Sequence, residues 1–165
     1  HSGQVDIRLS ARADSNASAG NMLDELELQI RSRLGDRIYG KDDTTLEEAA
    51  LEKLQKLDHT LVVLESGLDG LLTARLNRFP ETFTGGLVLP PMGLDAFQAS
   101  ARQYSEYLPA DLHLFAHLHR GNEHHLNVQM LCRGQLTQHM KTYGGPVQAA
   151  HLRAVNLTLD LLRRR

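Results

Sequence analysis

Short apolar runs alternate with segments of helical periodicity along most of the chain, and this alternation restricts the fold more than any other feature. The clearest run, Leu61 to Leu64, is apolar at every position, as in a strand that is buried on both faces. Turn residues Glu65 to Gly70 follow it, and then a helical pattern that ends at Pro80. A strand, a turn and a helix in this order predict a layered α/β/α domain with a central mixed sheet.

The segments around this module extend the same pattern. A helix through Leu57 is expected to begin with a capping box, formed by Thr44 or Thr45 with Glu47 or Glu48 three residues later. The further elements expected in chain order are a strand at 85–89, a helix at 94–107, a hairpin of strands 112–118 and 126–132, an edge strand at 136–143 and a final helix at 147–162.

The first 41 residues form a separate, smaller pattern. Val5 to Leu9 alternates apolar and polar residues with period two, and Met22 to Leu34 keeps helical spacing up to Gly35. Arg37 to Gly40 can return as a short strand. We therefore expect a small βαβ segment over residues 1–41, and a larger α/β domain over residues 42–165.

Composition narrows the classes of partner. The 165 residues carry a formal net charge of −2 with mixed signs, so nucleic-acid binding is not expected. No apolar stretch approaches the roughly 20 residues that span a bilayer, and we expect a cytoplasmic location without membrane contact. The single cysteine, Cys132, lies in an apolar run and is expected to be a small buried hydrophobe. Because the chain starts at His1 without methionine, we expect an excerpt of a longer polypeptide.

Two stretches, Val5 to Asp14 and Leu34 to Glu48, closely resemble the linker region of the competence/damage-inducible CinA family. The resemblance continues through Thr60 to Gly70 and Phe83 to Val88. It implies that residues 1–41 are part of a KH-like segment and that residues 42–165 are similar to the nicotinamide-nucleotide amidase domain of this family. It also implies a nucleotide-processing domain on the N-terminal side.

The family's amidases are similar around a Glu-Ser-Cys-Thr-Gly-Gly turn, of which Glu65, Ser66 and Gly70 are kept here. The resemblance implies that Ser66 is the nucleophile, and that Glu65, Gly70 and Gly121 bind the ligand. A serine at a strand-to-helix turn is chemically reasonable, because the N–H groups at a helix start stabilise an oxyanion or hold a phosphate.

The rest of the family signature is replaced. The lysine that the resemblance implies as the general base falls at Asp95, and the preceding tyrosine falls at Pro90. A Gly-Ile-Ala-Gly-Pro loop falls at 118–122, where Gly121 alone is kept and larger side chains crowd the ligand's approach. We therefore expect a catalytically degenerate relative of nicotinamide mononucleotide amidohydrolase, not an enzyme, with a structural or regulatory role. No cofactor is expected. We do expect homo-oligomerisation, a nucleotide ligand and contacts with the missing N-terminal domain.

Other interpretations stay open at this stage. The chain can be an active amidase that uses Ser66 with another base, such as Lys141, or with a histidine and an aspartate. A hairpin rich in histidine suggests a metal-binding module, with the candidate ligands His117, His119 and His124. RNA binding by residues 1–41 is disfavoured because they lack a Gly-x-x-Gly loop.

Two charged features are expected to be structural. Asp69 stands just before a helix and is expected to cap it. Arg163 to Arg165 end the last helix, where cations are favoured by the helix dipole, and are expected to be a solvated tail.

Overall fold

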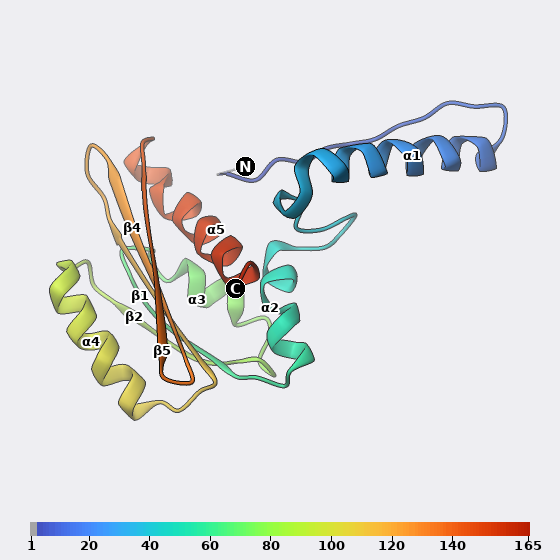
Figure 1. Ribbon diagram of the computed structural model, residues 1–165. Helices are drawn as coiled ribbons and strands as arrows, with labels where there is room; N and C mark the ends of the chain where they lie inside the picture. Colours follow the sequence, from blue (N-terminus) through green and yellow to red (C-terminus); the bar gives the residue numbers. More distant parts are fainter. Residues whose placement is uncertain (1–2) are drawn as a thin grey trace.

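The computed structural model of the protein describes residues 3–165 and consists of a layered α/β domain with an N-terminal extension (Figure 1). No helix in this part of the chain combines the length and the apolar character needed to cross a membrane. The helices are α1 (Asn16–Leu34), α2 (Leu46–Lys56), α3 (Leu71–Leu76), α4 (Leu94–Tyr107) and α5 (Ala150–Arg163), with short 3-10 turns η1 (Gly35–Arg37) and η2 (Val147–Ala149). The strands are β1 (Leu61–Ser66), β2 (Phe83–Leu89), β3 (Leu112–His119), β4 (His124–Cys132) and β5 (Gln135–Tyr143).

The five strands form one mixed sheet in the order β2-β1-β3-β4-β5. β1 lies between β2 and β3 and is parallel to both, whereas β3, β4 and β5 form an antiparallel meander. The predicted mixed sheet and the hairpin are therefore confirmed.

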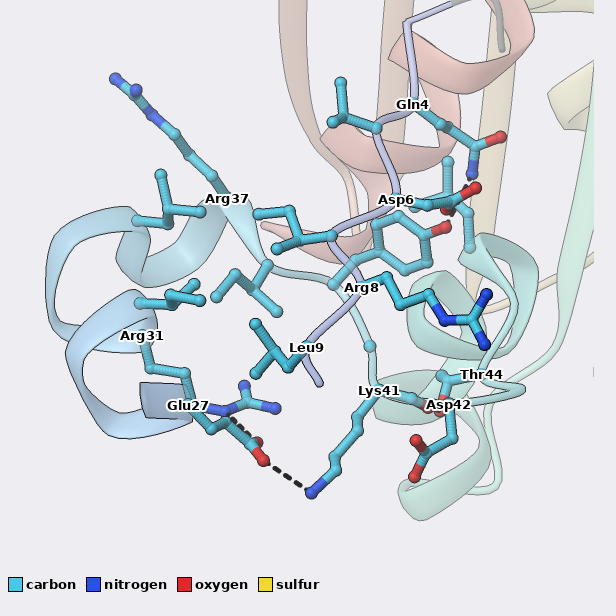
Figure 2. Close-up of a pocket in the computed structure, with 18 of the residues that line it drawn as sticks. Gln4, Asp6, Arg8, Leu9, Glu27, Arg31, Arg37, Lys41, Asp42 and Thr44 are labelled. Atoms are coloured by element: carbon cyan, nitrogen blue, oxygen red, sulfur yellow. Dashed lines mark hydrogen bonds and ion pairs between the residues drawn. The ribbon is translucent and has the colours of Figure 1, made fainter. Parts of the chain in front are cut away.

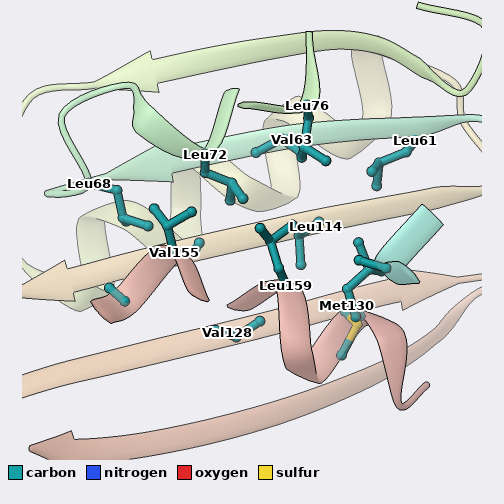
Figure 3. Close-up of a cluster of buried hydrophobic side chains, with 14 of the residues drawn as sticks. Leu61, Val63, Leu68, Leu72, Leu76, Leu114, Val128, Met130, Val155 and Leu159 are labelled. Carbon is teal, nitrogen blue, oxygen red and sulfur yellow. The ribbon is translucent and has the colours of Figure 1, made fainter. Parts of the chain in front are cut away.

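Helices cover both faces of the sheet, as predicted. α2, α3 and α5 pack on one face around Leu72 and Leu159 (Figure 3). α4 packs on the other face, where Phe97 is fully buried against Val62 and Leu64. This arrangement explains the unbroken apolar run of β1, because successive side chains enter cores on opposite faces. Cys132 packs against the larger core from a half-buried position, so the buried site expected for it is only partly reached.

The N-terminal extension differs from the expected βαβ segment. Its helix forms as predicted, but neither Val5 to Leu9 nor Arg37 to Gly40 is a strand, and η1 takes up part of the second segment. A strand needs a partner for its backbone hydrogen bonds, and in residues 3–165 neither segment belongs to the sheet. α1 has no buried residue, and Leu28 is 69% exposed.

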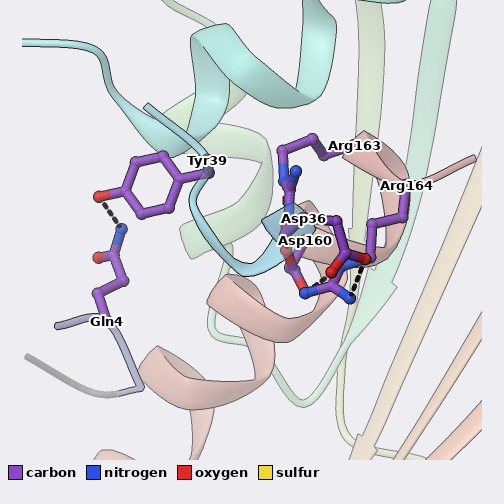
Figure 4. Close-up of polar contacts among 6 residues, drawn as sticks. All are labelled: Gln4, Asp36, Tyr39, Asp160, Arg163 and Arg164. Carbon is purple, nitrogen blue, oxygen red and sulfur yellow. Dashed lines mark hydrogen bonds and ion pairs between the residues drawn. The ribbon is translucent and has the colours of Figure 1, made fainter. Parts of the chain in front are cut away.

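The C-terminal end of α5 fastens this extension to the domain (Figure 4). Arg164 pairs with the carboxylate of Asp36 at 2.9 Å, and Arg163 donates a hydrogen bond to the carbonyl of the same residue. Both arginines also pair with Asp160 on α5. The predicted solvated tail is therefore wrong for Arg163, whose side chain is largely buried, whereas Arg164 forms its ion pairs from an exposed position.

The start of α2 is fixed by two polar interactions. Thr45 and Glu48 form the predicted capping box. In the same first turn, the carboxylate of Glu47 accepts a hydrogen bond from Arg75 of α3 at 2.5 Å, and Arg75 also donates to Asn156 of α5 at 2.6 Å. One arginine therefore links three helices on the same face of the sheet.

The pKa of Glu47 predicts how stability depends on pH. Burial alone raises the pKa of this carboxyl, but the Arg75 hydrogen bond, the Glu47 backbone N–H and nearby arginines outweigh it, so the pKa lies below its ordinary value of 4.5. A carboxyl whose pKa is lowered in the folded state adds stability at pH values above its ordinary pKa. This stability is lost as the pH falls through the folded-state pKa. The free energy of unfolding, measured by urea titration between pH 7 and pH 3, should therefore fall with pH. It should fall less in Glu47→Gln; an equally steep fall in the variant would contradict this role.

Candidate functional site

The carboxyl ends of β1 and β3 form the crevice where a parallel α/β sheet ordinarily binds ligands. After β1 the chain continues through α3 into β2, which lies at one edge of β1. It then continues through α4, on the other face of the sheet, into β3, which lies at the other edge of β1. The strand order reverses at this point, so side chains at the ends of β1 and β3 meet next to a topological switch point. Ser66 ends β1 and lies in register with His117 of β3.

Ser66 is fully buried, and its hydroxyl is engaged. Its Oγ–H donates to the carbonyl of Pro90, which follows β2, at 2.9 Å. On the next strand, Nε2 of His117 lies 2.8 Å from the carbonyl of Met92. Because a carbonyl only accepts, this ring nitrogen carries a proton and cannot take one from the serine. The segment 90–92 therefore binds both side chains.

Glu65 points to the opposite face of the sheet and helps to hold α3. Its side chain is fully buried, and Oε1 accepts a hydrogen bond from the backbone N–H of Thr73 at 2.8 Å. Thr73 lies in the first turn of α3, where backbone N–H groups have no partner within the helix. Glu65 thus acts as a remote helix cap, since Gly70 at the N-cap position has no side chain.

The turn after Ser66 is tightly packed against the end of β3. Gly67 has a φ of +78°, and a Cβ at this position would lie 2.1 Å from the carbonyl oxygen of Leu118. Gly70 has a φ of +77°, in the left-handed region that favours glycine. Gly67 therefore lets the chain turn directly against the end of β3, and little space for a ligand is left between this turn and Leu118.

Arg120, at the end of β3, binds this turn from the other side of the crevice. Its Nε donates to the carbonyl of Gly67 at 3.0 Å, and its guanidinium pairs with Asp69 at 2.6 Å. His151 of α5 lies 3.7 Å from the same carboxylate. The predicted helix cap at Asp69 is wrong, because the side chain turns to Arg120 and α3 has no side-chain cap. In the 118–122 loop, Arg120 thus binds the turn after Ser66, and Gly121 follows it.

Within residues 3–165, the hydrogen bond of the Ser66 hydroxyl goes to Pro90 and not to Asp95 or Lys141. Asp95 is exposed in the first turn of α4. Lys141 is on β5, which is three strands away from β1. With about 4.8 Å between neighbouring strands, this separation is about 14 Å. Lys141 also pairs with Leu126, whose side chain enters the core on the face opposite to Ser66.

The histidines of the hairpin do not converge on one point. His117 is buried beneath α4 and packs 5.1 Å from the ring of Phe97, whereas the neighbouring strand directs His124 into the opposite face, beside Tyr143. His119 is exposed and stacks on His125 at 6.3 Å. Residues 3–165 contain no cluster of three or more His, Cys, Asp or Glu side chains that could hold a metal ion. His113 and His117 of β3 are both buried, at 7% and 4% exposed.

Sequence reasoning missed a cavity of about 1040 Å³ between the N-terminal extension and the domain (Figure 2). Apolar side chains of α1, including Leu23 and Ile30, line it together with charged residues. Glu27 accepts from Lys41 at 2.6 Å and from Arg31 at 2.8 Å, so these charges are paired with one another. Ser66 does not line this cavity. The sequence signal for this cavity is the apolar spacing of α1, which the expected βαβ arrangement would have covered with its two strands.

A matched pair of glycines tests the packing of the Ser66 turn. Gly67 and Gly134 have the same φ of +78°, but a Cβ at Gly134 meets nothing within 4 Å. Gly134→Ala should therefore cost only the left-handed backbone strain, about 1 kcal/mol. Gly67→Ala adds a clash with backbone and should cost about 3 kcal/mol or more in the free energy of unfolding. Equal costs in a denaturant titration would show that the crevice is looser than described.

Comparison with known proteins gives matches along most of the chain. Residues 1–40 match the family model of the damage-inducible protein CinA KH domain. Over 89 residues, 52% of this chain, it is 40% identical to a CinA-like protein of Dictyoglomus thermophilum and 44% identical to a putative competence-damage inducible protein of Moorella thermoacetica. It spans 22% of the length of each of these relatives.

Solved structures share the fold. A competence or damage-inducible protein of Enterobacter asburiae superposes with a TM-score of 0.63 at 17% identity, covering 74% of this chain and 98% of that one. A CinA superfamily protein of Escherichia coli gives a TM-score of 0.57 at 17% identity, covering 80% of this chain and 98% of that one. The chain is therefore similar to CinA proteins in its KH segment and over about half of its sequence, and it shares the fold of solved CinA superfamily structures.

Proposed function

We propose that this chain is a CinA-like KH segment and C-terminal domain, related to nicotinamide mononucleotide amidohydrolases, whose amidase site is closed and catalytically inactive. Its role would then be structural or regulatory: folding, dimerisation, or control of a nucleotide-processing domain. The observation that carries the proposal is the state of Ser66, which is fully buried and donates its hydroxyl proton to Pro90.

Amide hydrolysis by a serine has three requirements, and this geometry does not meet the first two. The hydroxyl must reach the substrate, a base must accept its proton, and donors must stabilise the oxyanion. Here the hydroxyl is enclosed, and the carbonyl that accepts its hydrogen bond cannot act as a base. The base position implied by the family is Asp95, which is exposed on α4.

Arg120 supports the same proposal from the other side of the crevice. Its guanidinium binds the carbonyl of Gly67 and the carboxylate of Asp69, so it fixes the turn where a substrate would have to enter. Its positive charge is neutralised by Asp69, so the charge does not remain available for a nucleotide phosphate. A nucleotide ligand would therefore need a site other than this crevice.

The N-terminal extension supports a role in contact with another domain. Met22, Leu26 and Leu28 of α1 are all more than one third exposed, at 51%, 39% and 69%. A helix of a folded domain ordinarily buries such side chains against a partner. We propose that the partner is the nucleotide-processing domain implied by the family, and that the assembly is cytoplasmic.

An ammonia-release assay with nicotinamide mononucleotide tests the proposal. The native chain should release no more ammonia than a sample without protein, and Ser66→Ala should not change the rate. The same variant should lower the free energy of unfolding by about 1 kcal/mol, because a buried hydrogen bond to Pro90 is lost.

The opposite result is equally clear. Turnover of about 1 per second or faster that is abolished by Ser66→Ala, in a variant that is still folded by circular dichroism, would show an active amidase. The Asp95→Ala variant serves as a control for the family's base position. A loss of turnover there as well would assign Asp95 a catalytic role and overturn the proposal.

A further inference from the structure

A small pocket of about 190 Å³ lies where β4 begins, β5 ends and α5 starts. His124 and Tyr143, which pair with each other across β4 and β5, line it together with Arg153 in the first turn of α5. Its other walls are glycine, alanine and proline, and they include the Gly144–Gly145 turn. Ser66 does not line this pocket, so the pocket is separate from the crevice at the end of β1.

Arg153 brings to this pocket a positive charge that no acidic group neutralises. Within residues 3–165 its guanidinium forms no ion pair, and it lies over the ring of Tyr143 at 5.0 Å from the ring centroid. The residues that line the pocket include no aspartate and no glutamate. Burial raises the pKa of Tyr143 to about 12, so its hydroxyl stays neutral and donates to the carbonyl of Ala150 at 2.7 Å. The charge of the pocket therefore favours an anion.

His124 adds a buried ring nitrogen that lacks a partner. The residue is fully buried, and its Nε2 donates to the carbonyl of Gly145 at 2.9 Å. Because a carbonyl only accepts, Nε2 carries a proton, and Nδ1 is the nitrogen left to bind a ligand. Nδ1 is buried and has no hydrogen-bond partner within residues 3–165. A buried polar atom without a partner costs stability, so Nδ1 points to a polar group that the pocket receives.

We propose that this pocket binds the phosphate group of a phosphomonoester. The phosphate oxygens accept hydrogen bonds from the guanidinium of Arg153, whose fork of N–H groups matches them. A phosphate monoanion also donates its own proton to Nδ1 of His124, whereas the dianion accepts a hydrogen bond from the protonated ring. A carboxylate ion has no proton to donate and satisfies the protonated ring alone, so the pair of side chains favours phosphate.

The size and position of the pocket favour an ester over a free phosphate ion. At about 30 Å³ for each water molecule, the pocket has room for about six waters, which suits a phosphate group but not a whole nucleotide. Arg153 and Gly3 also line the cavity of about 1040 Å³ between the N-terminal extension and the domain. The rest of the ester therefore has space beyond Arg153, next to apolar side chains such as Leu23 and Ile30.

This inference goes beyond the function proposed above. Binding at this pocket is measured without turnover and involves neither Ser66 nor Asp95. Failure to bind phosphate would leave the closed crevice unaffected, and an active amidase would leave this pocket unaffected.

An NMR titration of the isotope-labelled chain with inorganic phosphate, at neutral pH and constant ionic strength, tests the site. The amide signals of Gly144 and Gly145 should shift and saturate, with a dissociation constant of about 1 mM or lower. Arg153→Gln should weaken binding about tenfold or more, because charge-assisted hydrogen bonds are lost. Arg102→Gln removes an equal charge from α4, on the other face of the sheet, and should leave binding unchanged.

Phenyl phosphate in a parallel titration distinguishes an ester from a free phosphate ion. It should shift the same two amides and bind at least as tightly, because its ring reaches the larger cavity. A pocket that binds inorganic phosphate but excludes phenyl phosphate would contradict an ester ligand. Shifts that do not saturate up to about 50 mM phosphate would overturn the proposal. Equal weakening by Arg153→Gln and Arg102→Gln would overturn it as well, because binding would then follow net charge alone.

Discussion

The burial of β1 is the constraint on which the rest of the structure depends. This strand is paired along both edges and covered on both faces, so every one of its six residues is buried. Buried polar groups must form hydrogen bonds or cost stability. Glu65 and Ser66, the last two residues of the strand, accordingly bind Thr73 and Pro90. Glu65 therefore holds the helix that follows its own strand, and Ser66 holds the loop that follows the neighbouring strand β2.

Enclosure of the crevice follows from the same packing. Gly67 allows the backbone to lie against the carbonyl of Leu118, and Arg120 closes the opposite side by binding the Gly67 carbonyl. Asp69 neutralises the guanidinium and also faces His151, so α5 is connected to the turn. The site is thus occupied by the protein's own side chains, and its residues have structural partners in place of a substrate.

Periodicity and turn residues predicted most of the α/β domain, because local signals determine these elements. The apolar run of β1 and the capping box at Thr45 have local physical causes, and both were found. The errors depend on tertiary contacts. Val5 to Leu9 alternates correctly but has no strand beside it, and the alternation of His117 and His124 did not reveal that they point to opposite faces. Asp69 and Arg163 likewise bind partners distant in sequence, which spacing does not indicate.

The central claim is that Ser66 is a structural residue in a closed site, and its chemical reactivity tests this most directly. The native chain can be treated with a fluorophosphonate that labels activated serines, and the product read by intact-protein mass spectrometry and peptide mapping. Because the hydroxyl is buried and donates to Pro90, the account predicts no adduct at Ser66. A stoichiometric adduct at Ser66 that forms in the folded chain, and disappears in Ser66→Ala, would contradict it.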